Sequence, residues 1–248
     1  EFDQQLFVRN SHEVLLTEAG QLLLPHAHAS INAAESCVTL LQELKHLLTG
    51  KLNIGVTFSF SSIMAETMGA FLKQYPRVKL NVCYASMAEL MERLQHHELD
   101  LVLAFKPTQP DEHVESQVLF RTRLAAVMGE CHPMAHRKLI SLKELEPYSL
   151  ALPAVGLQAR HAFEKVINGC DLSLKIKAEI NNVNLLFKLI RQSTYITILA
   201  QSAVVGENGL KAIPIDSPLG YMEGCIHTLH NGYTKHAARE FIRMLSTP

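Results

Sequence analysis

The apolar positions of the chain follow a heptad rhythm before residue 50 and a mixed strand and helix rhythm after it. In the first part they recur at alternating spacings of three and four residues, as in the seam of a coiled coil. The other faces of this segment are mixed in polarity, so it is not a helix buried on all sides. We predict a dimerisation helix over residues 17–50, with a helix that packs only on its own domain as the alternative. The seam positions are Leu24, Ala27, Ile31, Ala34, Val38 and Leu41.

Residues 1–16 precede this helix and contain the pattern of a short hairpin. Apolar runs at residues 6–8 and 14–16 flank the turn-forming sequence Asn10-Ser11-His12. Thr17 can cap the helix that follows. Pro25, in its second turn, is expected to kink the helix or to shift its start.

After residue 50, strand and helix patterns alternate. In a first segment apolar residues occupy every second position, and in the next they recur at helical spacing. The same two patterns then repeat, and a continuous apolar run follows. This β-α-β-α-β order predicts an α/β fold with a doubly wound parallel sheet. Polar segments with proline at 106–111 and 216–218 are expected to carry the chain between two lobes. We therefore assign residues 51–105 and 217–248 to lobe 1 and residues 106–216 to lobe 2.

Composition and charge restrict the class of protein. The 248 residues are 48% hydrophobic and 19% charged, as in an ordinary folded domain. The formal net charge is −1 at pH 7, and the sequence shows no basic patch. Both observations argue against nucleic-acid binding by this chain alone, although not by a longer parent chain.

The sequence also indicates a compartment. It has no apolar run of about 18 residues that could span a membrane, and its first residues do not resemble a signal peptide. The cysteines are odd in number and widely spaced, so free, unreactive thiols are favoured over a redox pair between Cys131 and Cys170. We expect a cytoplasmic protein with no membrane partner. The five cysteines are Cys37, Cys83, Cys131, Cys170 and Cys225.

Motifs of catalysis and cofactor binding are absent from the sequence. It has no G-x-S-x-G, no P-loop, no H-E-x-x-H and no G-x-G-x-x-G. Three histidine pairs have spacings that could suit a metal, but we interpret each as structural. We predict a protein that is not an enzyme and holds no cofactor or metal. The pairs are His26 with His28, His96 with His97, and His132 with His136.

Short motifs follow one another along most of the chain. They are L-F-V-R at 6–9, V-L-L-T-E-A-G at 14–20, G-K-L-N-I-G at 50–55, F-L-K-Q-Y-P at 71–76, E-L-D at 98–100 and H-P-M-A at 132–135. In order and spacing they resemble those of LysR-type transcriptional regulators. Within that family, the runs 100–105 and 189–213 are most similar to the cyanate-operon regulator branch, whose effector we do not carry over.

The resemblance implies an architecture. Residues 1–16 would be the wing of a winged helix-turn-helix, and residues 17–50 the linker helix through which the family dimerises. The rest would form a two-lobed effector domain of the periplasmic-binding-protein type. Most of the DNA-binding head would lie outside this chain. Arg9 is placed where a wing can touch the DNA backbone, and an ordinary solvated arginine is the alternative.

Candidate binding residues lie where expected strands end and helices begin. Ligands of open α/β sheets bind at such edges, and three serines fall there within residues 58–62. Helix capping is the alternative role for these hydroxyls. Arg160 could balance a carboxylate, so the expected effector is small, polar and anionic. The candidates are Ser59, Ser61, Ser62 and Ser86 from lobe 1, and Gln158, Arg160 and Thr197 from lobe 2.

The sequence thus predicts a LysR-type regulator. It would sense a small metabolite, form a homodimer or homotetramer, and bind promoter DNA through the full-length protein. A bilobed solute-binding protein without a role in DNA binding is the main alternative. A partner-binding module is a further one, which a cleft filled by Phe60 and Phe105 would favour.

Overall fold

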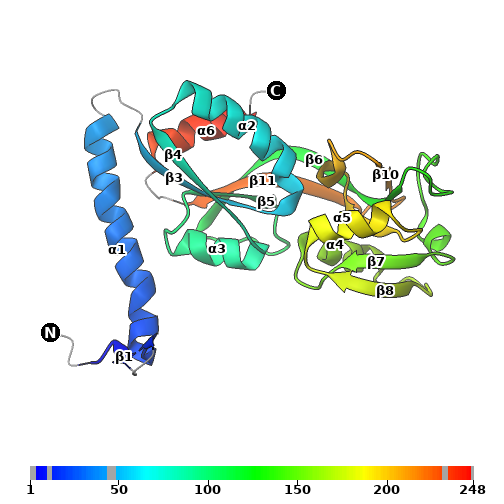
Figure 1. Ribbon diagram of the computed structural model, residues 1–248, viewed down its shortest axis with the longest axis horizontal. Coiled ribbons are helices and arrows are strands. Elements are labelled where there is room, and N and C mark those ends of the chain that lie inside the picture. The colour runs from blue at the N-terminus through cyan, green and yellow to red at the C-terminus, as the bar shows by residue number, and fades with distance from the viewer. Residues whose placement is uncertain (1–3, 10–12, 44–48, 231–233, 247–248) are drawn as a thin grey trace.

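The computed structural model describes residues 4–9, 13–43, 49–230 and 234–246, with only the backbone given for 35–36 and 39–43. A hairpin, a long helix and two α/β lobes follow one another along the chain (Figure 1). Strands β1 (Phe7–Arg9) and β2 (Val14–Leu16) pair antiparallel and form the expected hairpin. Its expected turn, residues 10–12, lies outside the described residues.

The long helix α1 (Glu18–Glu43) continues through Pro25. One of its faces contacts lobe 1, since His28 Nδ1 lies 3.3 Å from Glu98 Oε1 and Asn32 hydrogen-bonds the carbonyl oxygen of His97. The heptad seam lies on a different face. Its side chains at Leu24, Ile31 and Val38 are 40%, 57% and 56% exposed, and Ala34 is exposed as well. The side chain of Leu41 lies outside the described part of the helix.

Lobe 1 is built on the predicted β-α-β-α-β unit. The parallel strands β3 (Gly50–Val56), β4 (Val78–Tyr84) and β5 (Leu101–Phe105) lie in the order β5-β3-β4. Figure 1 shows α2 and α6 on one face of this sheet and α3 on the other. The side chains of α2 and α6 join the main core, whereas those of α3 form a second cluster. These helices are α2 (Ser61–Gln74), α3 (Met87–Gln95) and α6 (His236–Ser246).

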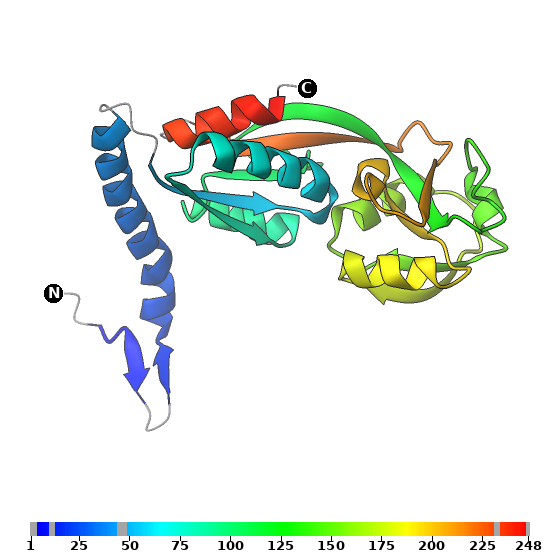
Figure 2. The same cartoon turned by 45° about the horizontal axis from the view of Figure 1, so that its top comes forward.

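Two antiparallel strands connect the lobes. The 16-residue strand β6 (Val114–Gly129) pairs with β11 (Tyr221–Leu229) as far as Arg123, and from Leu124 onward it pairs with strands of lobe 2. Figure 2 shows this pair of strands running between the lobes. One seven-stranded sheet therefore extends from lobe 1 into lobe 2, and β7 and β8 form a separate pair.

This arrangement moves one of the expected lobe boundaries. Residues 106–111 do not cross to lobe 2, because the chain turns back there and β6 first pairs along lobe 1. The crossing comes at residues 123–124, inside a hydrogen-bonded strand that carries no turn signal. The return crossing, between Ile215 and Gly220, agrees with the segment expected at 216–218.

Lobe 2 is a smaller sheet with helices around it. Beside β6 lie β9 (Thr197–Ala200) and β10 (Leu210–Pro214), and β7 pairs parallel with β8. Three short 3-10 helices complete the described elements. The remaining bounds are β7 (Ser149–Pro153), β8 (Lys175–Ile180), α4 (Gln158–Ile167), α5 (Val183–Arg191), η1 (Phe58–Phe60), η2 (Leu142–Leu145) and η3 (Gln201–Val204).

An aromatic cluster packs in the core of lobe 1 behind the interlobe edge. The ring of Phe60 lies 5.3 Å from that of Phe105 and 5.2 Å from that of Phe120, measured between centroids. Phe60 and Phe105 are buried, at 0% and 2% exposure. Because both rings pack into the core, they do not fill the space between the lobes.

Gly55, near the end of β3, allows α3 to pack closely on the sheet. A Cβ atom there would lie 2.8 Å from side-chain carbons of both Leu90 and Leu99. We expect Gly55→Ala to lower the free energy of unfolding by about 1–3 kcal/mol, as overpacking of a core does. Chemical denaturation measures the change.

Gly69→Ala is the matched control on the exposed face of α2. A Cβ at Gly69 meets nothing within 4 Å, so alanine should stabilise the helix by about 0.5–1 kcal/mol. Equal effects of the two substitutions would contradict the close packing of α3 against β3.

Candidate ligand-binding site

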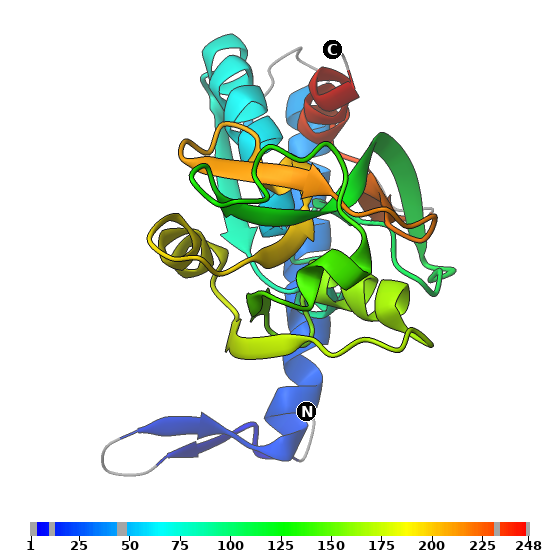
Figure 3. The same cartoon turned by 90° about the vertical axis from the view of Figure 1, so that its right-hand side faces the viewer.

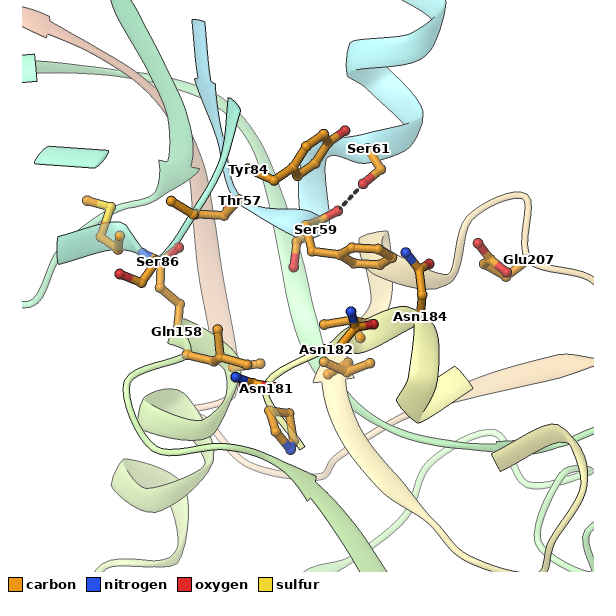
Figure 4. A pocket seen from close by; sticks show the side chains of 18 residues that line it. Thr57, Ser59, Ser61, Tyr84, Ser86, Gln158, Asn181, Asn182, Asn184 and Glu207 are labelled. Carbon is orange, nitrogen blue, oxygen red and sulfur yellow. Dashed lines mark hydrogen bonds between the residues drawn. The ribbon is translucent and has the colours of Figure 1, made fainter. Parts of the chain in front are cut away.

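A cavity of about 780 Å³ lies between the two lobes. Figure 4 shows polar side chains from both lobes turned toward it. Its walls combine hydroxyl and amide groups with the apolar side chains of Phe58, Met87 and Leu157. The polar residues that line it are Thr57, Ser59, Ser61, Tyr84, Ser86, Gln158, Asn181, Asn182, Asn184 and Glu207.

Four helices begin at this cavity. The first residues of α2 and α4, and those of α3 and α5 with their caps, belong to its wall. Each helix start carries partial positive charge and backbone N–H groups without partners inside the helix. Neither α2 nor α4 has a side-chain cap. The N–H of Ser61, the first residue of α2, already donates to the carbonyl oxygen of Phe58. A bound anion could therefore use the first-turn N–H groups of α4 and those of α2 beyond Ser61.

The serine cluster divides between the cavity and the opposite lobe. Ser59 and Ser61 line the cavity, and the Ser61 hydroxyl donates a hydrogen bond to the carbonyl oxygen of Phe58 over 2.6 Å. Ser62 is not part of the wall. Its hydroxyl donates to the carbonyl oxygen of Val205 in lobe 2 over 2.8 Å, so it joins the lobes.

Ser86 lies in the cavity wall and also caps a helix. Its hydroxyl oxygen accepts a hydrogen bond from the backbone N–H of Glu89 over 3.3 Å. Asn182 has the same position in lobe 2, where its side-chain oxygen accepts from the N–H of Leu185 over 2.9 Å. Both residues therefore hold a helix start in place at the cavity, as N-caps do.

Gln158 joins the two lobes at the base of the cavity. Its side-chain oxygen accepts from the backbone N–H of Phe105 over 3.1 Å, and its side-chain nitrogen donates to the carbonyl oxygen of Phe105 over 2.8 Å. The amide thus pairs with the end of β5 as a neighbouring strand would. Gln158 is both a wall residue and a contact between the lobes.

Arg160 does not face the cavity. Its side chain is 11% exposed, and its guanidinium pairs with Glu164 at 2.8 Å and with Glu179 at 2.6 Å and also donates to the carbonyl oxygen of Pro153. Burial opposes its charge, but the hydrogen bonds to Glu179 and Glu164 outweigh burial and raise the pKa of Arg160. Two carboxylates of lobe 2 already balance this cation, so it is not the counter-charge expected for a ligand.

Thr197 is also outside the cavity wall. It is fully buried at the start of β9, whereas Leu199 near the end of that strand lines the cavity. Two residues of strand span about 7 Å, which separates the two positions. Of the seven predicted residues, the structure thus brings Ser59, Ser61, Ser86 and Gln158 together at one cavity and leaves out Ser62, Arg160 and Thr197.

Several wall residues were not predicted from the sequence. Asn181, Asn182 and Asn184 follow β8 and begin α5, in the same relation to strand and helix as the serines of lobe 1. Reading lobe 2 for polar runs between strand and helix would have found them. The charged wall residue Glu207 is paired with Arg191. Within the described part of the chain, no basic side chain lines the cavity.

Comparison with known proteins shows the family. Residues 45–247 match the LysR substrate binding domain, so the chain belongs to that family. Among curated relatives, it is 24% identical to the HTH-type transcriptional regulator YvbU of Bacillus subtilis (strain 168) over 83% of this chain and 70% of the relative. It is 25% identical to the nitrogen assimilation regulatory protein nac of Escherichia coli (strain K12) over 82% of this chain and 66% of that protein.

Solved structures show the same fold. The regulatory domain of CcmR from Synechocystis PCC6803, in complex with 2-PG, superposes with a TM-score of 0.71 at 19% identity, covering 80% of this chain and 96% of that one. The effector binding domain of QuiR, in complex with shikimate, gives 0.68 at 17% identity, covering 79% and 95%. The prediction of a two-lobed α/β effector-domain fold is thereby confirmed.

No helix among the described residues is long and apolar enough to cross a membrane. No group of three or more histidine, cysteine, aspartate or glutamate side chains is placed to hold a metal in that part of the chain.

Gln158→Ala should loosen the contact between the lobes. Without the amide, the Phe105 N–H loses its acceptor, so we expect its hydrogen exchange to become roughly tenfold faster, as for the loss of a hydrogen bond worth about 1 kcal/mol. Asn184→Ala, in the same wall, is the control and should leave this amide unchanged. Unaltered exchange at Phe105 in Gln158→Ala would refute the contact.

Proposed function

We propose that this chain is the sensing and dimerising part of a LysR-type transcriptional regulator. Its interlobe cavity would bind a small, polar, anionic metabolite. The observation that carries this proposal is the convergence of four helix starts on a cavity lined with hydroxyls and amides. The function involves no catalysis and no cofactor, and DNA binding by the full-length protein would place it in the cytoplasm.

An anion can be held here without a basic side chain. Each helix start is equivalent to roughly half a positive charge, and its free N–H groups point toward a ligand. Hydroxyls and amides add donors at no cost of charge burial. The ligands named for the two structural neighbours, 2-PG and shikimate, are small polar molecules. They support a ligand of this general kind for the present chain.

Binding would act on the angle between the lobes. Ser62 and Gln158 already link the two lobes, and a ligand in the cavity would add contacts to both. The ligand changes the balance of lobe arrangements only as far as it binds one more tightly than another. In the full-length protein this change would reposition the DNA-binding heads on the promoter, where Arg9 would contact the DNA backbone.

We assign the homodimer contact to the heptad seam of α1. One face of α1 lies against its own lobe through His28 and Asn32, whereas the seam side chains of Leu24, Ile31, Ala34 and Val38 are exposed. An exposed apolar stripe of this length is what a second helix would cover. A homodimer would use this seam, and a homotetramer would need a further contact between effector domains.

Charge in the seam should separate the subunits. Ile31→Glu places a carboxylate at the centre of the stripe, where a partner helix would bury it. We expect at least roughly a tenfold rise in the dimer dissociation constant, measured by analytical ultracentrifugation. The control is Leu22→Glu, at a position 69% exposed and off the seam, which should dissociate like the unsubstituted chain. Equal dissociation of both variants would exclude the seam.

Ligand binding can be tested by thermal shift with small carboxylates and sugar phosphates. A ligand that binds the folded state raises the melting temperature. At a ligand concentration one hundred times the dissociation constant, the folded state is stabilised by about 2.7 kcal/mol. We expect at least one anion to raise it in the unsubstituted chain, and Ser61→Ala or Ser59→Ala to reduce the shift.

The control is Ser246→Ala, which removes a hydroxyl on α6 that likewise donates to a backbone carbonyl, that of Ile242. This variant should keep the full shift. A shift that survives both substitutions in the cavity would place the ligand elsewhere, and a panel without any shift would leave the serines as structural residues only.

A further inference from the structure

A second, smaller pocket lies where the strands cross between the lobes. Its volume is about 370 Å³, and we call it the hinge pocket. Both lobes contribute to it, since β6 and β11 supply one side and the segment around η3 supplies the other. Its residues are Arg121, Thr122, Arg123, Gln201, Ser202, Val205 and Tyr221. It shares none of them with the large cavity.

The pairing of β6 with β11 places Arg121 and Arg123 on the same side of the crossing strands. Arg121 of β6 faces Glu223 of β11, and Arg123 faces Tyr221. Residues two apart on a strand lie on the same face, so both guanidinium groups emerge on one side of the crossing. Arg121 pairs with Glu223 at 2.9 Å. Arg123 lies over the ring of Tyr221, with its guanidinium carbon 5.3 Å from the centroid.

One hydrogen-bond donor of Arg123 has no partner among the described residues. One terminal nitrogen donates to the carbonyl oxygen of Ile215 over 3.1 Å, which fixes the group at the return crossing. Its Nε–H is buried and has no hydrogen-bond partner among the described residues. A guanidinium held in one place, with an N–H still free, is suited to an oxyanion that accepts two hydrogen bonds side by side.

Lobe 2 brings a second unused polar group to the pocket. The backbone N–H of Ser202 donates to the Thr122 hydroxyl over 3.2 Å, which holds η3 against β6. The Ser202 hydroxyl itself is buried and unpaired within the described structure. Buried polar groups of proteins are nearly always satisfied, so two unsatisfied groups in one pocket point to a polar ligand.

The charge of the pocket has one sign. Of its lining residues, two are cationic and none is anionic. Glu223 borders the pocket and pairs with both Arg121 and Lys106. Its one negative charge offsets one of the three positive charges of Arg121, Arg123 and Lys106. An oxyanion next to the Arg123 Nε–H or the Ser202 hydroxyl would therefore be attracted by the pocket and not repelled.

We propose that the hinge pocket binds a small oxyanion, such as a phosphate group. Arg123 and Ser202 would hold it with their unused N–H and O–H donors, and Arg121 would add charge. The ligand would touch the crossing strands and η3 of lobe 2 together. The hinge pocket would thus sense a second anion separately from the interlobe cavity, and its occupancy would restrain the angle between the lobes.

The experiment is a titration of the chain with inorganic phosphate at constant ionic strength, with chloride as the balancing anion. Arginine Nε–H groups are followed by proton–nitrogen NMR, and Arg123→Lys identifies the Arg123 signal by its loss. We expect this signal to move saturably with phosphate. Ser202→Ala removes a hydroxyl that makes no hydrogen bond among the described residues, so it should keep the fold and weaken phosphate binding roughly tenfold.

Arg121→Gln should weaken phosphate several-fold, and Ser246→Ala on α6 should leave the affinity unchanged. Three outcomes overturn the proposal. The first is an Arg123 signal that stays still while phosphate binds elsewhere, the interlobe cavity included. The second is a signal that moves without saturating, and the third is phosphate binding by Ser202→Ala and Arg121→Gln as tight as by the unsubstituted chain.

Discussion

The hydrogen-bonded ladder of β6 is the constraint on which the rest of the effector domain depends. At about 3.3 Å per residue its 16 residues span roughly 50 Å, and they pair with β11 in lobe 1 and with β9 and β10 in lobe 2. The lobes are therefore two parts of one sheet. A change in their relative angle has to twist or bend this strand near residues 123–124, because the strand offers no free linker that could absorb it.

This constraint also explains the chemistry of the cavity. The continuous sheet brings the helix-starting edges of both lobes to one cavity. Figure 3 views the molecule from the lobe 2 end and shows the β1–β2 hairpin and the start of α1 projecting beyond the lobes. The polarity comes from backbone and from uncharged side chains, while the one arginine expected to supply charge is neutralised by Glu164 and Glu179 inside lobe 2. A site of this kind recognises a ligand by direction of hydrogen bonds more than by charge.

Local patterns in the sequence predict the fold class, the heptad helix and the parallel strands of lobe 1, because each depends on spacing within a short segment. They predict Ser59, Ser61 and Ser86 for the same reason, since strand ends and helix starts are visible in the pattern. They do not predict the crossing at residue 123, which lies inside a regular strand. Nor do they show which way Arg160 or Ser62 points, because their partners, Glu179 and Val205, are distant in sequence or in the other lobe.

The discontinuity of lobe 1 has a consequence for synthesis. Lobe 2 is made from one continuous stretch, so all of its strands can be present while the chain is still on the ribosome. Lobe 1 needs β11 and α6, which follow lobe 2 in the sequence, to cover β5 and to complete the core around Phe71 and Phe241. Until then β3, β4 and β5 have an open edge and an uncovered apolar face, which is the state of a nascent chain that chaperones protect.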